Sequence, residues 1–391
     1  MKKVVLIPDS FKGTMSSSRI CDIIQRKIKQ HDPTCKVVSI PVADGGEGTV
    51  DCFLEALHGT RVSLTVNNPY LEPVRCSYGM IDDGKTAVIE MASCAGLSLI
   101  EDRLDPLQTT TYGVGELIAD AVRRGCRKIV IGLGGSSTND GGVGAASALG
   151  IRFLRENGEV FLPMGGTLNQ ICDIDSTGLL AGVEKCDIVC MYDIDNPMFG
   201  PTGASYIFGP QKGADSKMVE LLDENIRHLA QIIKEKYNVD VAKQSGAGAG
   251  GAMGAGMAAF LHARLQSGIE TVLDAVHFEQ KIQQADFIIT GEGKFDSQSL
   301  RGKVVIGVAK RAKPSGIPVI AVVGDIEGEI DEAYSMGVAS IFSINRVAIP
   351  YTQAKLRSEN DLALTVDTIL RFYDMCRRTL PPYSNDRTDR V

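Results

Sequence analysis

The chain lacks tryptophan, has only five histidines and contains no long apolar run. No stretch approaches the roughly 20 apolar residues of a membrane-spanning helix, so we expect no membrane segment. The apolar run Val4–Ile7 near the start is too brief for a signal peptide and lacks a cleavage site. The histidines lie outside all of the glycine-rich loops considered below, and no GxSxG elbow is present. A Ser-His-Asp hydrolase is therefore disfavoured.

The ten cysteines show no CxxC spacing. Cys186 and Cys190 lie close together but have no paired cysteine or histidine cluster nearby, as a structural zinc site would need. We therefore expect buried thiols in a reducing cytoplasm.

The charge of the chain is mildly acidic, with 41 Lys and Arg against 48 Asp and Glu and a formal net charge of −7. Because the charge is spread along the chain, nucleic acid is not expected as a partner. A nucleotide can still bind where backbone amides and a few cations neutralise its phosphates. The length of 391 residues and the apolar share of 44% favour two domains, and 42 glycines without tryptophan favour an α/β enzyme.

Two βαβ patterns lie near the two ends of the chain. The first consists of strands at 4–7 and 35–41 around a helix at 17–28, and the second of strands at 287–289 and 319–323 around a helix at 304–312. These patterns predict one doubly wound domain with a parallel sheet, split by an insertion. We expect residues 1–85 and 286–378 to form that domain, 86–285 to form a second α/β domain, and 379–391 to form a polar tail.

Four segments are rich in glycine together with hydroxyl or acidic side chains, although the third has no carboxylate: 43–49, 132–142, 246–256 and 290–303. Glycine lets the backbone approach a phosphate, and carboxylates hold Mg²⁺. Any one of these segments alone is better explained as an ordinary tight turn. Four in one chain favour a phosphate-binding, Mg²⁺-dependent α/β enzyme, in which loops that follow neighbouring strands, such as 9–13 and 44–49, should be neighbours.

The second segment follows a strand at 129–131 and leads into a helical run at 143–149, which puts amide donors where the helix dipole favours an anion. The fourth, Thr290–Lys303, offers anion donors and metal ligands in one loop, and polar loops of this length usually have a function. Asp193 follows a strand at 188–192 and could ligate a metal or accept a hydroxyl proton. A solvated turn explains Asp193 equally well.

Two nucleotide-binding patterns can be examined directly. The Walker A pattern is absent, because Gly302-Lys303 is followed by Val304 and lacks the spaced upstream glycine. Gly246-x-Gly248-x-x-Gly251 matches the dinucleotide fingerprint, but 240–245 does not form a convincing strand. An NAD-dependent oxidoreductase is thus one alternative, and it needs that strand. A regulator that senses a sugar acid is another, but neither end of the chain offers a basic DNA-binding helix.

Five motifs taken together resemble one known family, the bacterial type I glycerate kinases. They occur in order along the chain, and the resemblance runs from about Lys2 to Arg371: Pro8–Gly13, Val42–Thr49, Leu133–Gly142, Phe208–Gly213 and Thr290–Lys303. Five ordered motifs make a chance match improbable. The sequence is not similar to P-loop or protein kinases.

The resemblance implies a fold and an activity. It implies a two-domain α/β kinase, with a flavodoxin-like domain built from both chain ends, an inserted α/β domain, and the active site in the cleft between them. Members of the family phosphorylate D-glycerate with ATP and Mg²⁺ in glycerate, galactarate and glucarate catabolism, and this branch usually gives 2-phosphoglycerate. ATP and D-glycerate are therefore the expected partners of a cytoplasmic enzyme, with nucleic acid and membrane excluded and a homodimer left open.

The resemblance and the loop chemistry together suggest roles for individual residues. The expected catalytic residues are Asp193, as first choice for the base, then Asp296 and Asp44, with Lys12 to offset developing charge. The expected ligands of the glycerate substrate are Ser10, Lys12, Lys212 and Arg301. The expected metal ligands are Asp140, Asp193 and Glu292. The expected ligands of the ATP phosphates are Gly134, Gly135, Ser136, Ser137, Thr138, Asn139, Gly291, Gly293 and Lys303.

Overall fold

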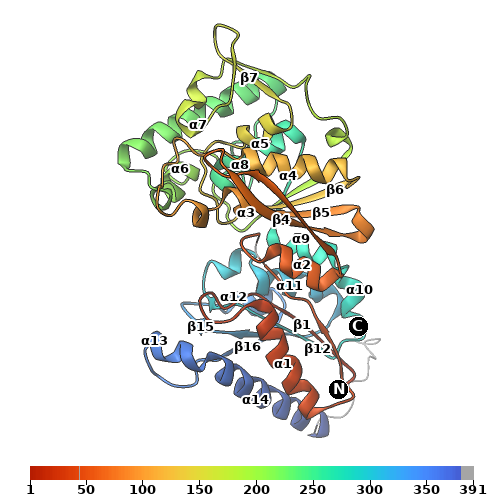
Figure 1. The fold of residues 1–391 in the computed structure, drawn as a ribbon. Helices are drawn as coiled ribbons and strands as arrows, with labels where there is room; N and C mark the ends of the chain where they lie inside the picture. Colours follow the sequence, from red (N-terminus) through yellow and green to blue (C-terminus); the bar gives the residue numbers. More distant parts are fainter. Residues whose placement is uncertain (44, 380–391) are drawn as a thin grey trace, which may run out of the picture. The chain divides into compact units, whose positions relative to one another are not determined.

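The computed structural model describes residues 1–43 and 45–379, and the chain divides into two compact units (Figure 1). The first unit comprises Met1–Val42 and His277–Val391, and the second comprises Ala43–Val276. The first unit is thus built from both ends of the chain, as the two separated βαβ patterns predict.

The first unit contains a sheet of five parallel strands in the order β16-β14-β12-β1-β2. Numbered within the unit, this order is 2-1-3-4-5, the doubly wound arrangement of flavodoxin-like folds. The fold class expected from the sequence is therefore confirmed. The strands are β1 (Lys3–Pro8), β2 (Lys36–Ser39), β12 (Phe287–Gly291), β14 (Val319–Val323) and β16 (Val338–Ser343), with a small parallel pair β13 (Lys294–Phe295) and β15 (Asp325–Ile326) beside them.

Helices complete the core of the first unit. Successive side chains of a strand point to opposite faces, and Val4 to Ile7 of β1 are all fully buried, so both faces of the sheet are covered. Figure 1 shows α1 beside α14, and both contribute to the cluster that contains Val4 and Leu6. The helices are α1 (Ser17–His31), α10 (Phe278–Ile282), α11 (Val304–Ala312), α12 (Glu332–Ser335), α13 (Tyr351–Ala354) and α14 (Ser358–Thr379).

The second unit contains a six-stranded mixed sheet in the order β11-β10-β6-β5-β4-β3. The strands are β3 (Thr60–Asn67), β4 (Pro73–Ile81), β5 (Thr86–Glu90), β6 (Lys128–Gly132), β10 (Asp187–Tyr192) and β11 (Arg264–Ser267). A second, three-stranded sheet has the order β8-β7-β9, with β7 (Arg152–Leu154), β8 (Val160–Phe161) and β9 (Asp173–Asp175).

Most helices of the second unit share one apolar cluster with its larger sheet, whereas α2 and α9 contribute no residue to that cluster. They are α2 (Thr49–Leu57), α3 (Ala92–Ala95), α4 (Tyr112–Arg123), α5 (Val143–Ala148), α6 (Ala204–Phe208), α7 (Ser216–Tyr237), α8 (Ala249–Leu261) and α9 (Gly268–Ala275). No helix in the described part of the chain is both long and apolar enough to cross a membrane.

The boundaries of the two units differ from those expected from the sequence. Residues 43–85 were expected in the first domain, but β3 pairs with β4, and β4 pairs with β5, in antiparallel register. This hairpin therefore extends the sheet of the second unit, and the first boundary lies at Val42. The second boundary lies at His277, because α10 packs with α11. Of the expected tail, 380–391 lies outside the described residues, and Thr379 is the last residue of α14.

Candidate functional site

In the first unit, the order of the strands reverses between β1 and β12, and two predicted segments meet there. The amide of Asp9 donates to the carbonyl oxygen of Gly291 at 2.8 Å. A Cβ atom added to Gly293 would lie 3.3 Å from the Cα atom of Phe11. Ligands of open α/β sheets bind at this kind of switch point, outside the carboxyl ends of the strands. The 9–13 and 290–303 segments thus form one candidate half-site.

Glu292 is the buried carboxyl group of this half-site. Its side chain is 5% exposed, and its Oε1 atom has no hydrogen-bond partner among the described residues. Burial raises the pKa of Glu292 to about 8, while the Ser299 hydroxyl and the charge of Lys303 act in the opposite direction. Without a bound cation, the carboxyl group therefore holds a proton near neutral pH. No cluster of three potential metal ligands occurs in the described chain.

The other predicted residues of the first unit lie in the segments that follow β1 and β12. Lys12 and Arg301 are exposed, and Ser10 is half-buried. Lys303 is the N-cap residue of α11, and its side chain makes no capping hydrogen bond. The first amides of α11 and the Lys303 ammonium are therefore suited to an anion. Asp296 accepts the amides of Gln298 at 2.8 Å and Ser299 at 3.3 Å, so it also shapes its own turn.

In the second unit, the 43–49 and 132–142 segments meet at the carboxyl ends of β6 and β10. The amide of Gly134 donates to the carbonyl oxygen of Gly45 at 3.0 Å. A Cβ atom on Gly132 would lie 2.4 Å from that same oxygen, and one on Gly134 would lie 2.7 Å from the Cα atom of Gly46. Glycine is therefore required where the two backbones cross. Asp44, a predicted catalytic residue, lies outside the described residues.

Asp193 lies directly after β10, at the edge where these loops meet, and its side chain is exposed. Asp195, two residues further along, is exposed as well. Mg²⁺ in phosphoryl-transfer sites is usually held by one or two carboxylates together with phosphate oxygens and water. The position of Asp193 is compatible with either of its two predicted roles.

The 136–140 stretch is more buried than a phosphate-binding loop was expected to be, since its five side chains are between 0% and 8% exposed. Asp140 accepts the amide of Thr111 at 2.8 Å and its hydroxyl at 2.9 Å through Oδ2, and the amide of Gly142 at 3.0 Å through Oδ1. Burial raises the pKa of Asp140, and these amides oppose the shift. Asp140 thus joins the loop to the starts of α4 and α5, and protein donors occupy both of its oxygens.

Lys212 lies in the same buried cluster. It ends the short 3-10 helix Pro210–Lys212 and is only 1% exposed. Its Nζ atom donates to the carbonyl oxygen of Thr138 at 2.6 Å and to the hydroxyl of Ser136 at 2.9 Å. Burial lowers the pKa of Lys212 to about 7, partly opposed by the charge of Asp140. Lys212, the residue expected to meet the substrate carboxylate, therefore contacts the hydroxyl of Ser136 and the carbonyl oxygen of Thr138.

The glycine-rich segment 246–256 packs against that loop. The first turn of α8 contains three residues of positive φ, Gly250, Gly251 and Ala252. A Cβ atom on Gly251 would lie 2.0 Å from the carbonyl oxygen of Thr138. Residues 238–248 contain no strand. The structure therefore lacks the feature that a dinucleotide-binding fingerprint requires, and the segment serves close packing.

Some residues of this cluster were missed by sequence reasoning. Thr110 and Thr111 are buried, and their hydroxyls donate hydrogen bonds to Asp140. The sequence feature that could have indicated them is a run of three threonines immediately before the helical pattern of α4. Glu90 ends β5, and its Oε1 atom accepts the amide of Val50 at 2.6 Å at the start of α2. Burial raises the pKa of Glu90. A single glutamate after an apolar strand gives no distinctive signal.

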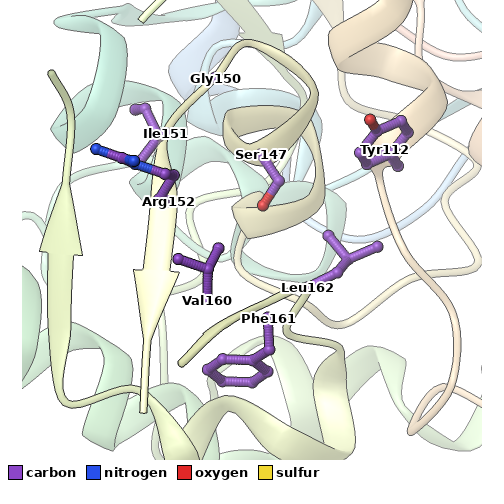
Figure 2. A pocket seen from close by; sticks show the side chains of 8 residues that line it. All are labelled: Tyr112, Ser147, Gly150, Ile151, Arg152, Val160, Phe161 and Leu162. Carbon is purple, nitrogen blue, oxygen red and sulfur yellow. The ribbon is translucent and has the colours of Figure 1, made fainter. Parts of the chain in front are cut away.

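A pocket of about 290 Å³ lies elsewhere in the second unit, beside α5 and the three-stranded sheet. Figure 2 shows Tyr112 and Arg152 on opposite sides of it, with Ser147 between them and Phe161 below. None of the residues predicted for the site lines this pocket.

The chain was compared with known proteins. The sequence model of the glycerate kinase family matches residues 4–374. Glycerate 2-kinase of Escherichia coli K12 is 45% identical over 343 residues, which are 88% of this chain and 90% of that protein. A Bacillus cereus glycerate kinase is 44% identical over 368 residues, 94% of this chain and 97% of its own.

A structural relative agrees with these matches. It is a crystal structure from Salmonella typhimurium LT2 whose protein is provisionally described as glycerate kinase 2. Its TM-score is 0.85 at 38% identity, and the match covers 96% of this chain and 99% of that one. The resemblance first suggested by five motifs is confirmed along nearly the whole length, and the chain belongs to the glycerate kinase family.

Proposed function

We propose that the protein phosphorylates D-glycerate with ATP and Mg²⁺ to give 2-phosphoglycerate and ADP. The pathway would be glycerate, galactarate or glucarate catabolism in the cytoplasm. The observation that carries the proposal is a family match over nearly the whole chain, joined to two glycine-rich half-sites at the carboxyl edges of two sheets. Neither half-site has the Walker A sequence, so the enzyme would bind phosphates by another arrangement of amides.

We assign the ATP phosphates to the amides of Gly134 to Asn139 and to the Lys303 end of α11. Backbone amides in a glycine-rich turn can converge on phosphate oxygens without a side chain in the way. The start of α11 offers uncapped amides and a lysine. Gly291 and Gly293 are assigned to the same phosphates. Gly291 also serves packing, because a Cβ atom there would lie 2.0 Å from the carbonyl oxygen of Val322.

Asp193 is the residue of this chain best suited to hold Mg²⁺ or to receive the hydroxyl proton of glycerate. It is an exposed carboxylate after a buried strand, and hard oxygen ligands suit Mg²⁺. When bound, Mg²⁺ would neutralise charge on the phosphates. Asp296 is the second candidate for the base.

For the glycerate carboxylate we propose Lys12, Arg301 and Ser10 as partners. Lys12 and Arg301 are exposed cations, and Ser10 follows the carboxyl end of β1. An arginine can bind a carboxylate through two parallel hydrogen bonds, which orients a small acid as well as attracting it. Positioning of this kind supplies much of the rate gain in phosphoryl transfer.

The proposal is tested by following ADP release from purified protein given ATP, Mg²⁺ and D-glycerate. Release that depends on all three reagents is expected. Arg301→Ala should raise KM for glycerate more than KM for ATP, and Arg346→Ala, an exposed arginine of the same unit, is the matched control. Failure of the wild-type protein to release ADP above its rate without glycerate would refute the proposed function.

A further inference from the structure

Three segments that are distant in sequence converge on the buried stretch 136–140. These are the Phe208–Gly213 motif, the glycine-rich start of α8, and the start of α4. The first two meet at Thr138, and the third holds Asp140. Asp140 is held by Thr111, and Asn139 donates through Nδ2 to the hydroxyl of Ser205 on α6 at 3.1 Å.

The carbonyl group of Thr138 is confined from two directions. Lys212 donates to its oxygen at 2.6 Å, and the bare Cα atom of Gly251 packs where a Cβ atom would come within 2.0 Å of that oxygen. The second bond of Lys212, to the hydroxyl of Ser136 at 2.9 Å, holds the loop two residues earlier. One ammonium group thus links the side chain of Ser136 to the backbone of Thr138.

The local chain holds Lys212 in this position. Its amide donates to the carbonyl oxygen of Gly209 at 2.9 Å, which closes the 3-10 turn. Gly213 then turns the chain with a φ of +97°, and a Cβ atom there would lie 2.6 Å from the Cβ atom of Leu104. The two glycines of the Gly-Pro-Gln-Lys-Gly motif therefore direct the lysine inward.

A lysine that is 1% exposed is costly to bury, and its hydrogen bonds to a hydroxyl and a carbonyl repay part of that cost. An apolar side chain of similar length would avoid the cost. Lys212 therefore has a role other than filling space. Its contacts indicate that role, because they fix the loop whose amides the proposed function assigns to the ATP phosphates.

We infer that Lys212 is a positioning residue, whose ammonium group holds the 136–138 backbone in the shape that receives the phosphates of ATP, and that it does not contact glycerate. This inference rests on the proposed function. Of the four substrate ligands expected from the sequence, Lys212 alone is fully buried, and the inference gives it a different role.

The test uses Lys212→Met, which keeps the unbranched stem and removes the donors, together with Ser136→Ala and the double variant. Lys217→Met, an exposed lysine near the start of α7, is the matched control. We expect Lys212→Met to raise KM for ATP or lower kcat by about ten- to hundredfold, the scale of a misplacement of about 1 Å. KM for glycerate should stay within about twofold. In the double variant, Ser136→Ala should add little to the effect of Lys212→Met, because both substitutions remove the same Lys212–Ser136 hydrogen bond.

Two results would overturn the inference. A selective rise in KM for glycerate would make Lys212 a substrate ligand. Unchanged kinetics with only a lower melting temperature would make it a purely structural residue. If Lys212→Met does not fold, the test rests on Ser136→Ala, which should raise KM for ATP or lower kcat by less than the ten- to hundredfold expected for Lys212→Met. Normal kinetics in Ser136→Ala would then refute the positioning role. If the wild-type protein does not phosphorylate glycerate, the proposed function fails, and calorimetric affinities for ADP in the same variants decide the role of Lys212 separately.

Discussion

The amide of Gly134 donates a hydrogen bond to the carbonyl oxygen of Gly45 at 3.0 Å, which joins two glycine-rich segments from different parts of the second unit. The crossing is close enough that side chains are excluded at Gly132 and Gly134. Because one segment follows β6 and the other precedes α2, the contact fixes the loop that follows β6 against a second backbone.

Gly134→Ala should therefore damage this crossing. The new Cβ atom would lie 2.7 Å from the Cα atom of Gly46, which is backbone and cannot rotate away. We expect the free energy of unfolding to fall by about 1–3 kcal/mol, the usual cost of overpacking. Urea denaturation measures it. In the control Gly79→Ala, the nearest atoms belong to the side chains of Leu54 and Val50, so a clearly smaller loss is expected, and equal losses would refute the account.

Asp140→Asn should destabilise the protein although it conserves size. The carboxylate accepts amide protons at both oxygens, whereas an asparagine side chain must turn its NH₂ group towards one of these donors. Leaving a buried donor unpaired costs about 1–3 kcal/mol, which urea denaturation would detect. The exposed Asp102→Asn is the control. A stable Asp140→Asn protein would argue that Asp140 is not the anchor of this loop.

Glu292→Gln should remove a pH dependence of stability. The pKa of Glu292 is raised to about 8 from a usual value of 4.5. Between these values the native protein keeps a proton that the unfolded chain has released, so stability falls as pH rises through this window. The variant lacks this loss. Its stability relative to wild type should therefore increase from about pH 4.5 and level off above pH 8.

Urea denaturation of both proteins at pH 5 and pH 8.5 would measure the Glu292 effect. The exposed Glu47→Gln provides the control for replacing a glutamate elsewhere in the chain. A constant difference between wild type and Glu292→Gln across this range would show that the carboxyl group is not protonated in the native protein.

Asp193→Asn should lower kcat far more than it raises KM, since a base or metal ligand acts mainly in the transition state. Asp195→Asn, another exposed carboxylate after the same strand, should be much less affected. Steady-state kinetics with each substrate varied in turn would separate the two parameters. A near-normal kcat in Asp193→Asn would move the role to Asp296 or another carboxylate.

The parallel sheet of the first unit could be predicted because its strands are short apolar runs separated by helical patterns. Val4–Ile7 and Phe287–Ile289 each have this character, and they pair in the structure. The hairpin of β3 and β4 was missed. Its alternating pattern is weakly apolar, since much of β3 is exposed, and it follows α2, which was assigned to the first domain together with the 43–49 segment. The boundary between the units was misplaced as a result.

The glycine-rich loops could also be found from sequence, but the environment of their side chains could not. Lys212 sits in a polar, glycine-flanked motif that usually indicates exposure, and only the packing of α6, α8 and the 136–140 stretch shows that it is buried. Asp140 likewise resembles a metal ligand by composition. Its partners, Thr111 and Gly142, are recognisable only once the chain is folded.

The central claim is tested most directly by phosphorus NMR of the reaction of the purified protein with ATP, Mg²⁺ and D-glycerate. The account predicts loss of the γ-phosphate signal of ATP and appearance of a phosphate ester coupled to the single C2 proton of 2-phosphoglycerate. An ester coupled to the two C3 protons would contradict the proposed position of transfer. No ester at all, with ATP unchanged, would contradict phosphorylation of glycerate by this protein.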